Sequence, residues 1–261
     1  MFERRDLADD VAAVRAAHAP DALVLDADAD FRALPPEAAE DLGLLVDSLS
    51  PATYPTSWLP EDAPAVLERY ASDAFTVGMP GDGTVTWTTQ TDPPVVVCKG
   101  RADGMSEPFL SFLLAEALVE VGLELPEQFL PFFGERYADL AAATSLSPSG
   151  DYQLGAALAT GWRGLATRAV FADWEDARDR LYDAWLDAGA RVEPRLGDLP
   201  GEVARGETAL PEAAELSCSA LKHAVEPPTP FAALDTAAYR NHGADYAVRW
   251  AGKTFARLRE D

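Results

Sequence analysis

The sequence predicts an α+β protein that is mostly helical and carries one small antiparallel sheet. Along most of the chain, apolar residues recur every three or four positions, which is the period of an amphipathic helix. Residues 75–99 differ, because they are rich in Val, Thr, Phe and Trp and are interrupted by PGDG and TDPP. That composition and punctuation predict a three-stranded antiparallel meander, which neighbouring helices must cover.

The apolar spacing predicts a series of helices separated by short connections. They cover residues 6–18, 36–49, 61–72, 106–122, 126–143, 151–165, 172–189, 211–224 and 236–259. Ser106 is a typical N-cap residue, and Pro131 is expected to kink or divide the helix that it interrupts. The Gly- and Pro-rich segment 189–210 has no period, so we expect a long surface connection there.

The remaining organisation follows from the meander and its surroundings. Val85 and Trp87 are two apart on a strand, so they should share one face of the sheet, and the apolar helix 106–122 is the nearest cover for that face. We expect a single domain over residues 1–261. SLSPSG at 145–150 is the one boundary at which composition allows a subdivision, into an N-terminal α+β part and a C-terminal helical part.

The composition predicts a folded protein with a strongly acidic surface. The chain has 44 acidic and 21 basic residues, a net charge of −23, only three Lys and no Ile, yet 48% of it is hydrophobic. Such a composition is typical of a salt-adapted protein, because molar salt shortens the Debye length to about 3 Å and screens self-repulsion. No basic stripe for phosphates is evident, so we expect neither nucleic acid nor a membrane surface as a partner.

Targeting signals and cysteines also restrict the function. The opening MFERRDL contains an Arg pair, but no apolar segment of a signal peptide follows. The most apolar stretch, 109–122, contains two Glu and is shorter than the roughly 18 residues of a membrane span. We therefore expect a soluble, cytoplasmic protein, in which Cys98 and Cys218 lie in apolar stretches and form no disulfide framework.

The stretch ALVLDADADF at 22–31 carries the most suggestive acids. Asp26 and Asp28 follow four apolar residues and resemble the Asp-x-Asp motif of the haloacid-dehalogenase superfamily. That resemblance implies a magnesium-dependent phosphohydrolase with Asp26 as nucleophile and Asp28 as acid/base, assisted by Ser48 and Asp82. The spacing disfavours it, because 56 residues from Asp26 to Asp82 are few for the crossovers of a parallel sheet. No Lys lies between them to hold the phosphate.

The same acids match a calcium loop only in part. Asp26, Asp28, Asp30 and Glu37 stand at positions 1, 3, 5 and 12 of an EF-hand loop, but Phe31 occupies the sixth position, where the turn requires Gly. We therefore expect no metal site, and no cofactor signature is complete.

Glu116 and Glu120 are a further candidate pair. They stand four apart on the apolar helix 106–122, so their carboxylates lie on one side of it. They either flank a buried face or lie at the solvent margin, and the tendency of long charged side chains to reach solvent favours the margin.

His242 lies within an aromatic pattern near the C-terminus. Tyr239, Tyr246 and Trp250 recur around it at helical spacing. Such a stripe is first a signal of a core, which favours a buried, hydrogen-bonded histidine over a catalytic one.

Tyr54 and Trp58 are the candidate binding residues. They lie in SPATYPTSWLP, where three prolines surround them and no regular element is predicted. Aromatic residues on loops often contact a partner, so these two mark the expected contact surface.

Three stretches resemble an uncharacterised haloarchaeal protein family, namely FERRDLADDVAAVRAAHAPDALVLDADADF, VDSLSPATYPTSWLPEDAP and FTVGMPGDGTVTWTTQTDPPVVV. The resemblance implies a salt-adapted cytoplasm and supplies no catalytic residues. Because every catalytic signature is incomplete, the sequence favours a binding or interaction protein, whose partner is an unidentified protein or small molecule. The phosphohydrolase is the alternative.

Overall fold

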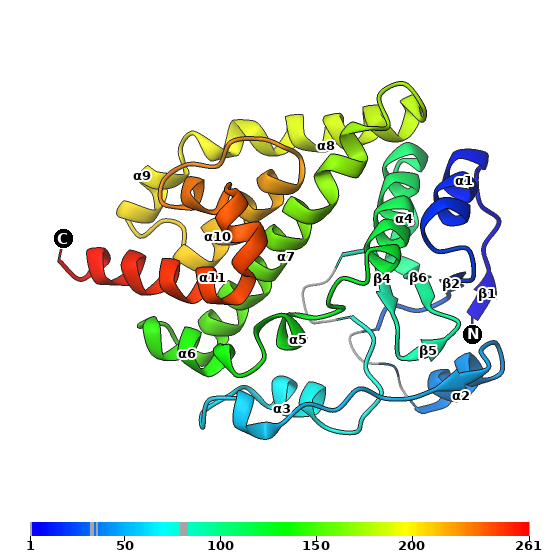
Figure 1. Ribbon diagram of the computed structural model, residues 1–261, viewed down its shortest axis with the longest axis horizontal. Helices are drawn as coiled ribbons and strands as arrows, with labels where there is room; N and C mark the ends of the chain where they lie inside the picture. The colour runs from blue at the N-terminus through cyan, green and yellow to red at the C-terminus, as the bar shows by residue number, and fades with distance from the viewer. Residues whose placement is uncertain (1, 32–33, 35, 79–82, 261) are drawn as a thin grey trace. The chain divides into compact units, whose positions relative to one another are not determined.

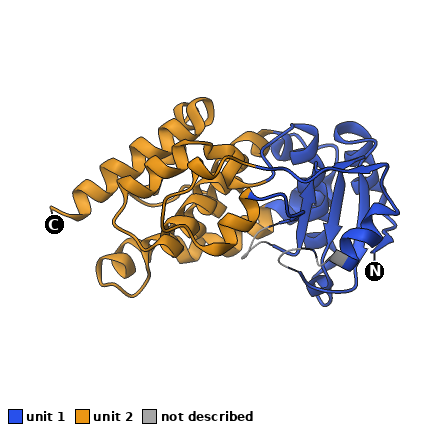
Figure 2. Cartoon of the chain, turned by 90° about the horizontal axis from the view of Figure 1, so that it is seen from below, with its two compact units in different colours: residues 1–53, 72–127, 170–185 blue, residues 54–71, 128–169, 186–261 orange. Residues whose placement is uncertain are grey.

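Each of the two compact units of the chain is assembled from three separate segments. Unit 1 comprises residues 1–53, 72–127 and 170–185, and unit 2 comprises residues 54–71, 128–169 and 186–261 (Figure 2). The structure is a computed structural model that describes residues 2–31, 34, 36–78 and 83–260.

Unit 1 contains a four-stranded mixed sheet in the order β1-β2-β6-β4 (Figure 1). Its strands are β1 (Phe2–Arg4), β2 (Leu23–Ala27), β4 (Val85–Thr88) and β6 (Val95–Cys98). The β1–β2 and β4–β6 pairs are antiparallel, whereas β2 and β6 are parallel, with Leu23 opposite Val95. Two short strands, β3 (Ser48–Leu49) and β5 (Thr91–Asp92), form a separate antiparallel pair.

The predicted three-stranded antiparallel meander over residues 75–99 is wrong. Its β4 and β6 segments do pair antiparallel, but β5 pairs with β3, and β6 pairs parallel with β2. The apolar stretch at 22–25 forms the first part of β2, the parallel neighbour of β6. Because the paired residues are 72 positions apart, no local sequence pattern indicates this pairing. Most of the predicted PGDG turn, residues 80–82, lies outside the described residues.

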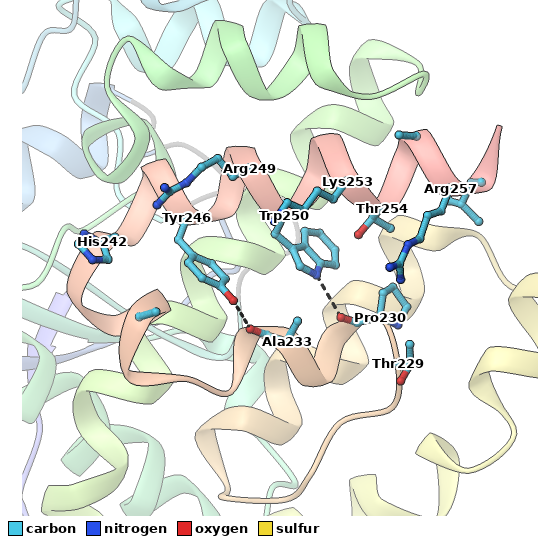
Figure 3. Close-up of a pocket in the computed structure, with 13 residues that line it drawn as sticks. Thr229, Pro230, Ala233, His242, Tyr246, Arg249, Trp250, Lys253, Thr254 and Arg257 are labelled. Atoms are coloured by element: carbon cyan, nitrogen blue, oxygen red, sulfur yellow. Dashed lines mark hydrogen bonds between the residues drawn. The ribbon is translucent and has the colours of Figure 1, made fainter. Parts of the chain in front are cut away.

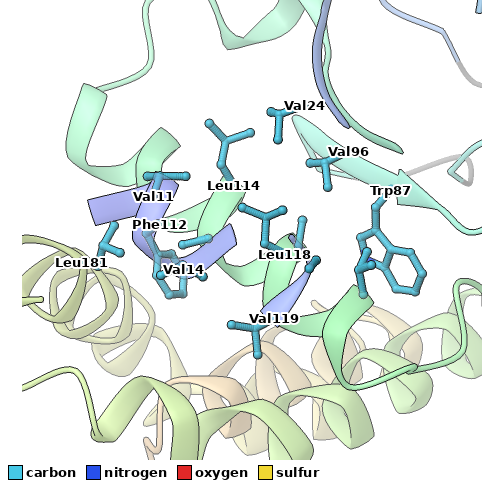
Figure 4. Close-up of a cluster of buried hydrophobic side chains, with 14 of the residues drawn as sticks. Val11, Val14, Val24, Trp87, Val96, Phe112, Leu114, Leu118, Val119 and Leu181 are labelled. Atoms are coloured by element: carbon cyan, nitrogen blue, oxygen red, sulfur yellow. The ribbon is translucent and has the colours of Figure 1, made fainter. Parts of the chain in front are cut away.

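The two central strands are apolar because both faces of the sheet are covered. On one face, Val24 and Val96 pack with Val14 of α1 (Asp9–His18) and Leu118 of α4 (Glu107–Gly122), as Figure 4 shows. Val85 and Trp87 pack on this same face, as predicted. Alternate residues point the other way, as the pleat requires.

The opposite face of the sheet has its own apolar cover. Leu25, Val95 and Val97 pack there with Phe2 and with Leu42 of α2 (Pro36–Gly43). A short 3-10 helix, η2 (Gly100–Ala102), follows β6 and leads into α4. Helix α4 is buried along almost its whole length, which explains why its sequence is apolar all round.

Unit 2 is helical, so the mostly helical class is confirmed. The further elements are η1 (Thr56–Trp58), α3 (Ala65–Ala71), α5 (Phe129–Phe133), α6 (Arg136–Ala143), α7 (Pro148–Ala172), α8 (Asp179–Leu196), α9 (Leu199–Ala204), α10 (Leu210–Lys222), η3 (Phe231–Leu234) and α11 (Ala237–Leu258). Helices α7 and α8 each include residues of both units. The predicted helix 126–143 is divided at Gly134, which has φ +56°, while Pro131 lies inside α5.

The long connection predicted at 189–210 is wrong. Helix α8 continues to Leu196 with Pro194 inside it, and α9 follows. Leu196 and Leu199 are buried at 5% and 0% exposure. Their packing therefore stabilises helix in a segment whose Gly and Pro content disfavours it, since tertiary context routinely overrides propensity.

Helices α7 and α10 approach each other closely at two glycines. A Cβ on Gly161 would lie 3.0 Å from the Cys218 sulfur, and a Cβ on Gly164 would lie 2.8 Å from the Lys222 Cα. The absence of side chains at these two positions sets how near the helix axes come.

Candidate functional site

A hollow of about 910 Å³ runs along α11 and the segment 229–233, and we call it the α11 groove (Figure 3). Helix α11 begins at a formed cap, because the Thr236 hydroxyl accepts a hydrogen bond from the Tyr239 amide at 3.1 Å. The groove lies entirely within unit 2.

Helix α11 is broken at Gly243, which has φ +43° and ψ −120°. The backbone angle favours glycine there, and a Cβ would in addition lie 3.3 Å from the Phe132 ring, which would have to shift slightly. The Trp162 indole N–H donates to the Arg240 carbonyl at 3.0 Å, which satisfies a backbone acceptor beside the break.

Tyr246 and Trp250 form the aromatic floor of the groove. The Tyr246 hydroxyl donates to the Ala233 carbonyl at 2.7 Å, and the Trp250 indole N–H donates to the Pro230 carbonyl at 3.1 Å. Figure 3 shows both rings pointing from α11 toward the 229–233 segment. Both polar groups of the floor are thus already satisfied, and Trp250 is only 6% exposed.

Arg249, Lys253 and Arg257, here called the cation row, border the same groove. They stand four apart on α11, so their Cα atoms are about 6 Å apart along the helix axis. All three are exposed. Over the described part of the chain, Lys253 and Arg257 form no ion pair with a carboxylate, and the Arg249 Nε donates to the Asp245 backbone carbonyl at 3.1 Å.

The lining of the groove differs sharply from the composition of the chain. Thirteen residues drawn at random from this chain would include about two acidic residues and one basic residue. The thirteen described residues that line the groove include no Asp or Glu, whereas they include the cation row and His242. The lining of the groove therefore carries basic side chains without acidic ones, on a protein whose net charge is strongly negative.

A second, smaller hollow of about 400 Å³ lies at the break of α11, lined by Arg136, His242, Asp245 and Arg249. Here a carboxylate is present, because the Arg136 Nε lies 2.9 Å from an oxygen of Asp245. This pairing leaves the smaller hollow less positive than the α11 groove.

The interpretation of His242 as a core residue is wrong, because its side chain is exposed and borders both hollows. Of the other members of the stripe, Tyr239 and Trp250 are buried and Tyr246 is half-buried. Tyr239 donates to the Leu158 carbonyl at 2.7 Å. The break at Gly243 interrupts the helical period between His242 and Tyr246, so a continuous stripe in the sequence is not continuous in space.

The acids of ALVLDADADF lie at the end of β2. Asp26 forms an ion pair with Arg5 at 2.5 Å, Asp30 forms one with Arg101 at 2.9 Å, and Asp28 is exposed. Ser48 is exposed on β3, and Asp82 lies outside the described residues. Within the described residues, no group of three or more His, Cys, Asp or Glu could hold a metal ion. The phosphohydrolase site stays a prediction.

Glu116 and Glu120 do not lie at the solvent margin. They are buried at 8% and 9% exposure, and Glu120 accepts a hydrogen bond from the Trp87 indole at 2.7 Å. Because this bond ties α4 to β4, Glu120 has a structural role within unit 1.

Tyr54 and Trp58 do come together. Their rings stack with centroids 5.6 Å apart, both are half-buried, and Trp58 is the last residue of η1. The Trp58 ring lies 3.8 Å from where a Cβ on Gly134 would be. Their role as a contact surface stays a prediction.

Both cysteines are buried and free. Burial raises the pKa of Cys98 to about 11 and that of Cys218 to about 12. Because the thiolate is the reactive form, neither thiol is a nucleophile near neutral pH.

Sequence analysis missed the cation row, although its signal is visible. The segment RWAGKTFAR holds three of the 21 basic residues within nine positions, spaced by four. The row is hard to recognise in the sequence because acids outnumber bases two to one over the whole chain.

Across the described residues, we find no helix that combines the length and the apolarity that a bilayer crossing requires. Neither a curated protein nor a solved structure matches the chain. A family model described as "Family of unknown function (DUF7089)" matches residues 1–258, so the chain belongs to this family.

Proposed function

We propose that the protein is a binding protein and that the α11 groove holds its partner, which carries negative charge beside an apolar surface. The observation that supports this most directly is the lining of the groove, because the thirteen described lining residues include the cation row and no Asp or Glu. Because the chain has a net charge of −23, a lining without acidic residues distinguishes this surface as a candidate site for an anionic partner.

The two sides of the groove have complementary roles in this proposal. The cation row attracts and orients an anionic group, while Tyr246, Pro230 and Leu258 offer apolar surface against which the rest of the partner packs. Because Tyr246 and Trp250 are fixed by hydrogen bonds to the 229–233 segment, the floor is formed before the partner arrives. A preformed site loses less conformational entropy on binding.

We also propose that binding takes place in a salt-rich cytoplasm. The excess of acids and the scarcity of Lys support this setting. Ion pairs in direct contact persist at short range even where the Debye length is about 3 Å, whereas long-range repulsion between the acidic surface and an anionic partner is screened.

The proposal can be tested with anilinonaphthalene sulfonate, a fluorescent anion with an apolar body, and with octanoate as a competitor. We expect saturable fluorescence enhancement that octanoate reverses and that Lys253→Glu weakens. The matched control is Arg191→Glu, the same charge change at an exposed position of α8. Equal binding by the two variants would place the probe elsewhere and contradict the proposal.

The phosphohydrolase alternative has less support. Asp26 lies in a strand that has a parallel neighbour, as the alternative requires, but its carboxylate already pairs with Arg5. Hydrolysis of p-nitrophenyl phosphate with magnesium, lost in Asp26→Asn, would be the result that favours it.

A further inference from the structure

We propose that the partner is an acidic, amphipathic helix of another protein, which lies along the α11 groove with carboxylates at positions i, i+4 and i+8. This inference rests on the proposed function and specifies the class of partner.

The first argument is the spacing of charge. The cation row repeats every four residues, and the floor residues Tyr246 and Trp250 each precede a member of that row by three. Helix α11 thus presents a cationic row with a repeat of about 6 Å beside its aromatic floor, of which Tyr246 is half-buried and Trp250 is buried. A second helix with acids every four residues beside an apolar row has the same repeat and the complementary charge.

The second argument is the number of charges. The cation row extends over about 12 Å along α11, from Arg249 to Arg257. A single carboxylate or phosphate can contact only part of that length. An occupant that contacts all three cations must therefore carry several negative charges at regular intervals.

The third argument is the backbone of the occupant. The hydroxyl of Tyr246 and the indole N–H of Trp250 already bond to carbonyls of the chain, so the floor offers an extended peptide few partners. An extended backbone would bury unsatisfied amide groups against this floor, which is costly. A helix satisfies its own backbone hydrogen bonds and needs only side-chain contacts.

The same floor disfavours a single strand of nucleic acid. Strands of this kind bind through bases stacked on exposed aromatic rings. Trp250 is only 6% exposed and offers no such face. By contrast, Leu258 borders the groove at 49% exposure, as an apolar anchor for a protein partner would.

Fluorescence anisotropy with two labelled helical peptides tests the inference. The row peptide carries Glu at i, i+4 and i+8 beside a row of Leu. The control peptide has the same composition and helix content, with the Glu residues distributed around the helix. Octanoate and a ten-nucleotide oligo(dT) are tested in parallel, at the lowest KCl concentration at which circular dichroism shows the protein folded.

We expect the row peptide to bind at least about tenfold more tightly than the control peptide. Each charge reversal in the cation row should lower the affinity for the row peptide by about tenfold, because a contact ion pair becomes a repulsion. The variants are Arg249→Glu, Lys253→Glu and Arg257→Glu. Arg191→Glu should leave the affinity for the row peptide unchanged. A row peptide with its central Glu replaced by Lys should recover affinity for Lys253→Glu, which identifies the facing pair.

Other outcomes separate the inference from the function on which it rests. Equal binding of the two peptides would overturn the helical partner. Octanoate binding that depends on Lys253, without peptide binding, would also overturn it but would leave the proposed function standing. Oligo(dT) binding sensitive to the same reversals would replace the protein partner by nucleic acid. If no probe binds, both the function and the inference fail.

Discussion

Replacement of Gly164 by Ala tests the contact between α7 and α10. The added Cβ would lie 2.8 Å from the Cα and Cβ of Lys222 and 3.0 Å from its amide nitrogen. Carbon atoms in good contact are about 3.5–4.0 Å apart, so the helices must separate by roughly 0.7–1.2 Å. Because the contacted atoms are mostly backbone, no rotamer change relieves the overlap.

The magnitude follows from two opposing contributions. Overpacking costs about 1–3 kcal/mol, and contact with backbone favours the upper part of that range. Ala is favoured over Gly in a helix by about 1 kcal/mol. We therefore expect Gly164→Ala to lower the free energy of unfolding by about 1–2 kcal/mol, which for a chain of this size lowers Tm by about 2–8 °C.

Gly252→Ala is the matched control. Gly252 also lies in a helix, α11, but a Cβ built there meets nothing within 4 Å. The same chemical change should therefore stabilise the protein by up to about 1 kcal/mol. Thermal unfolding in molar KCl, followed by circular dichroism, measures both variants. A Gly164→Ala protein as stable as the wild type would refute the close packing of α7 on α10.

Three further predictions concern the core and the surface charge. Trp87→Phe removes the indole donor to the buried Glu120 carboxylate and should lower the free energy of unfolding by about 1.5–3 kcal/mol in urea titrations; an unchanged midpoint would contradict the bond. The pKa of Cys98 is about 11 in the fold and 9.0 for the free thiol, so the unfolded chain loses this proton first and stability should fall as pH rises from 9 to 11. Cys98→Ala should flatten that slope, and an identical pH profile for the variant would exclude the thiol. Because the net charge is −23, Tm should rise when dilute buffer is replaced by 2 M KCl, and a constant Tm would show that self-repulsion is not significant.

Most helices could be predicted because their apolar residues recur at helical spacing. Helices α1, α4, α10 and α11 start within a few residues of their predicted positions. The parallel pairing of β2 with β6 could not be predicted, because it joins residues 72 positions apart and depends on which sheet edge is open. The helical segment around Leu196 and Leu199 was missed because burial overrides local composition.

The candidate site shows a different limit. The spacing of Tyr246 and Trp250 identifies a stripe, but a sequence pattern does not reveal which of its residues the rest of the protein covers. The conformational break at Gly243 is the reason that His242 is exposed. A single glycine within a helical pattern does not by itself predict such a break. The cation row was obscured because a net charge averages over the whole chain, whereas a partner senses only the local potential.

The alternation of the two units along the chain has a consequence for biosynthesis. Unit 1 starts at the N-terminus but needs residues 170–185, and unit 2 needs residues 54–71 as well as the C-terminal segment. At about 5–20 residues per second, roughly 7–26 s pass between synthesis of residue 53 and residue 185. The nascent chain must therefore wait with β2 and α1 incompletely covered until residue 185 has been synthesised, and unit 2 cannot be completed until the C-terminal segment follows.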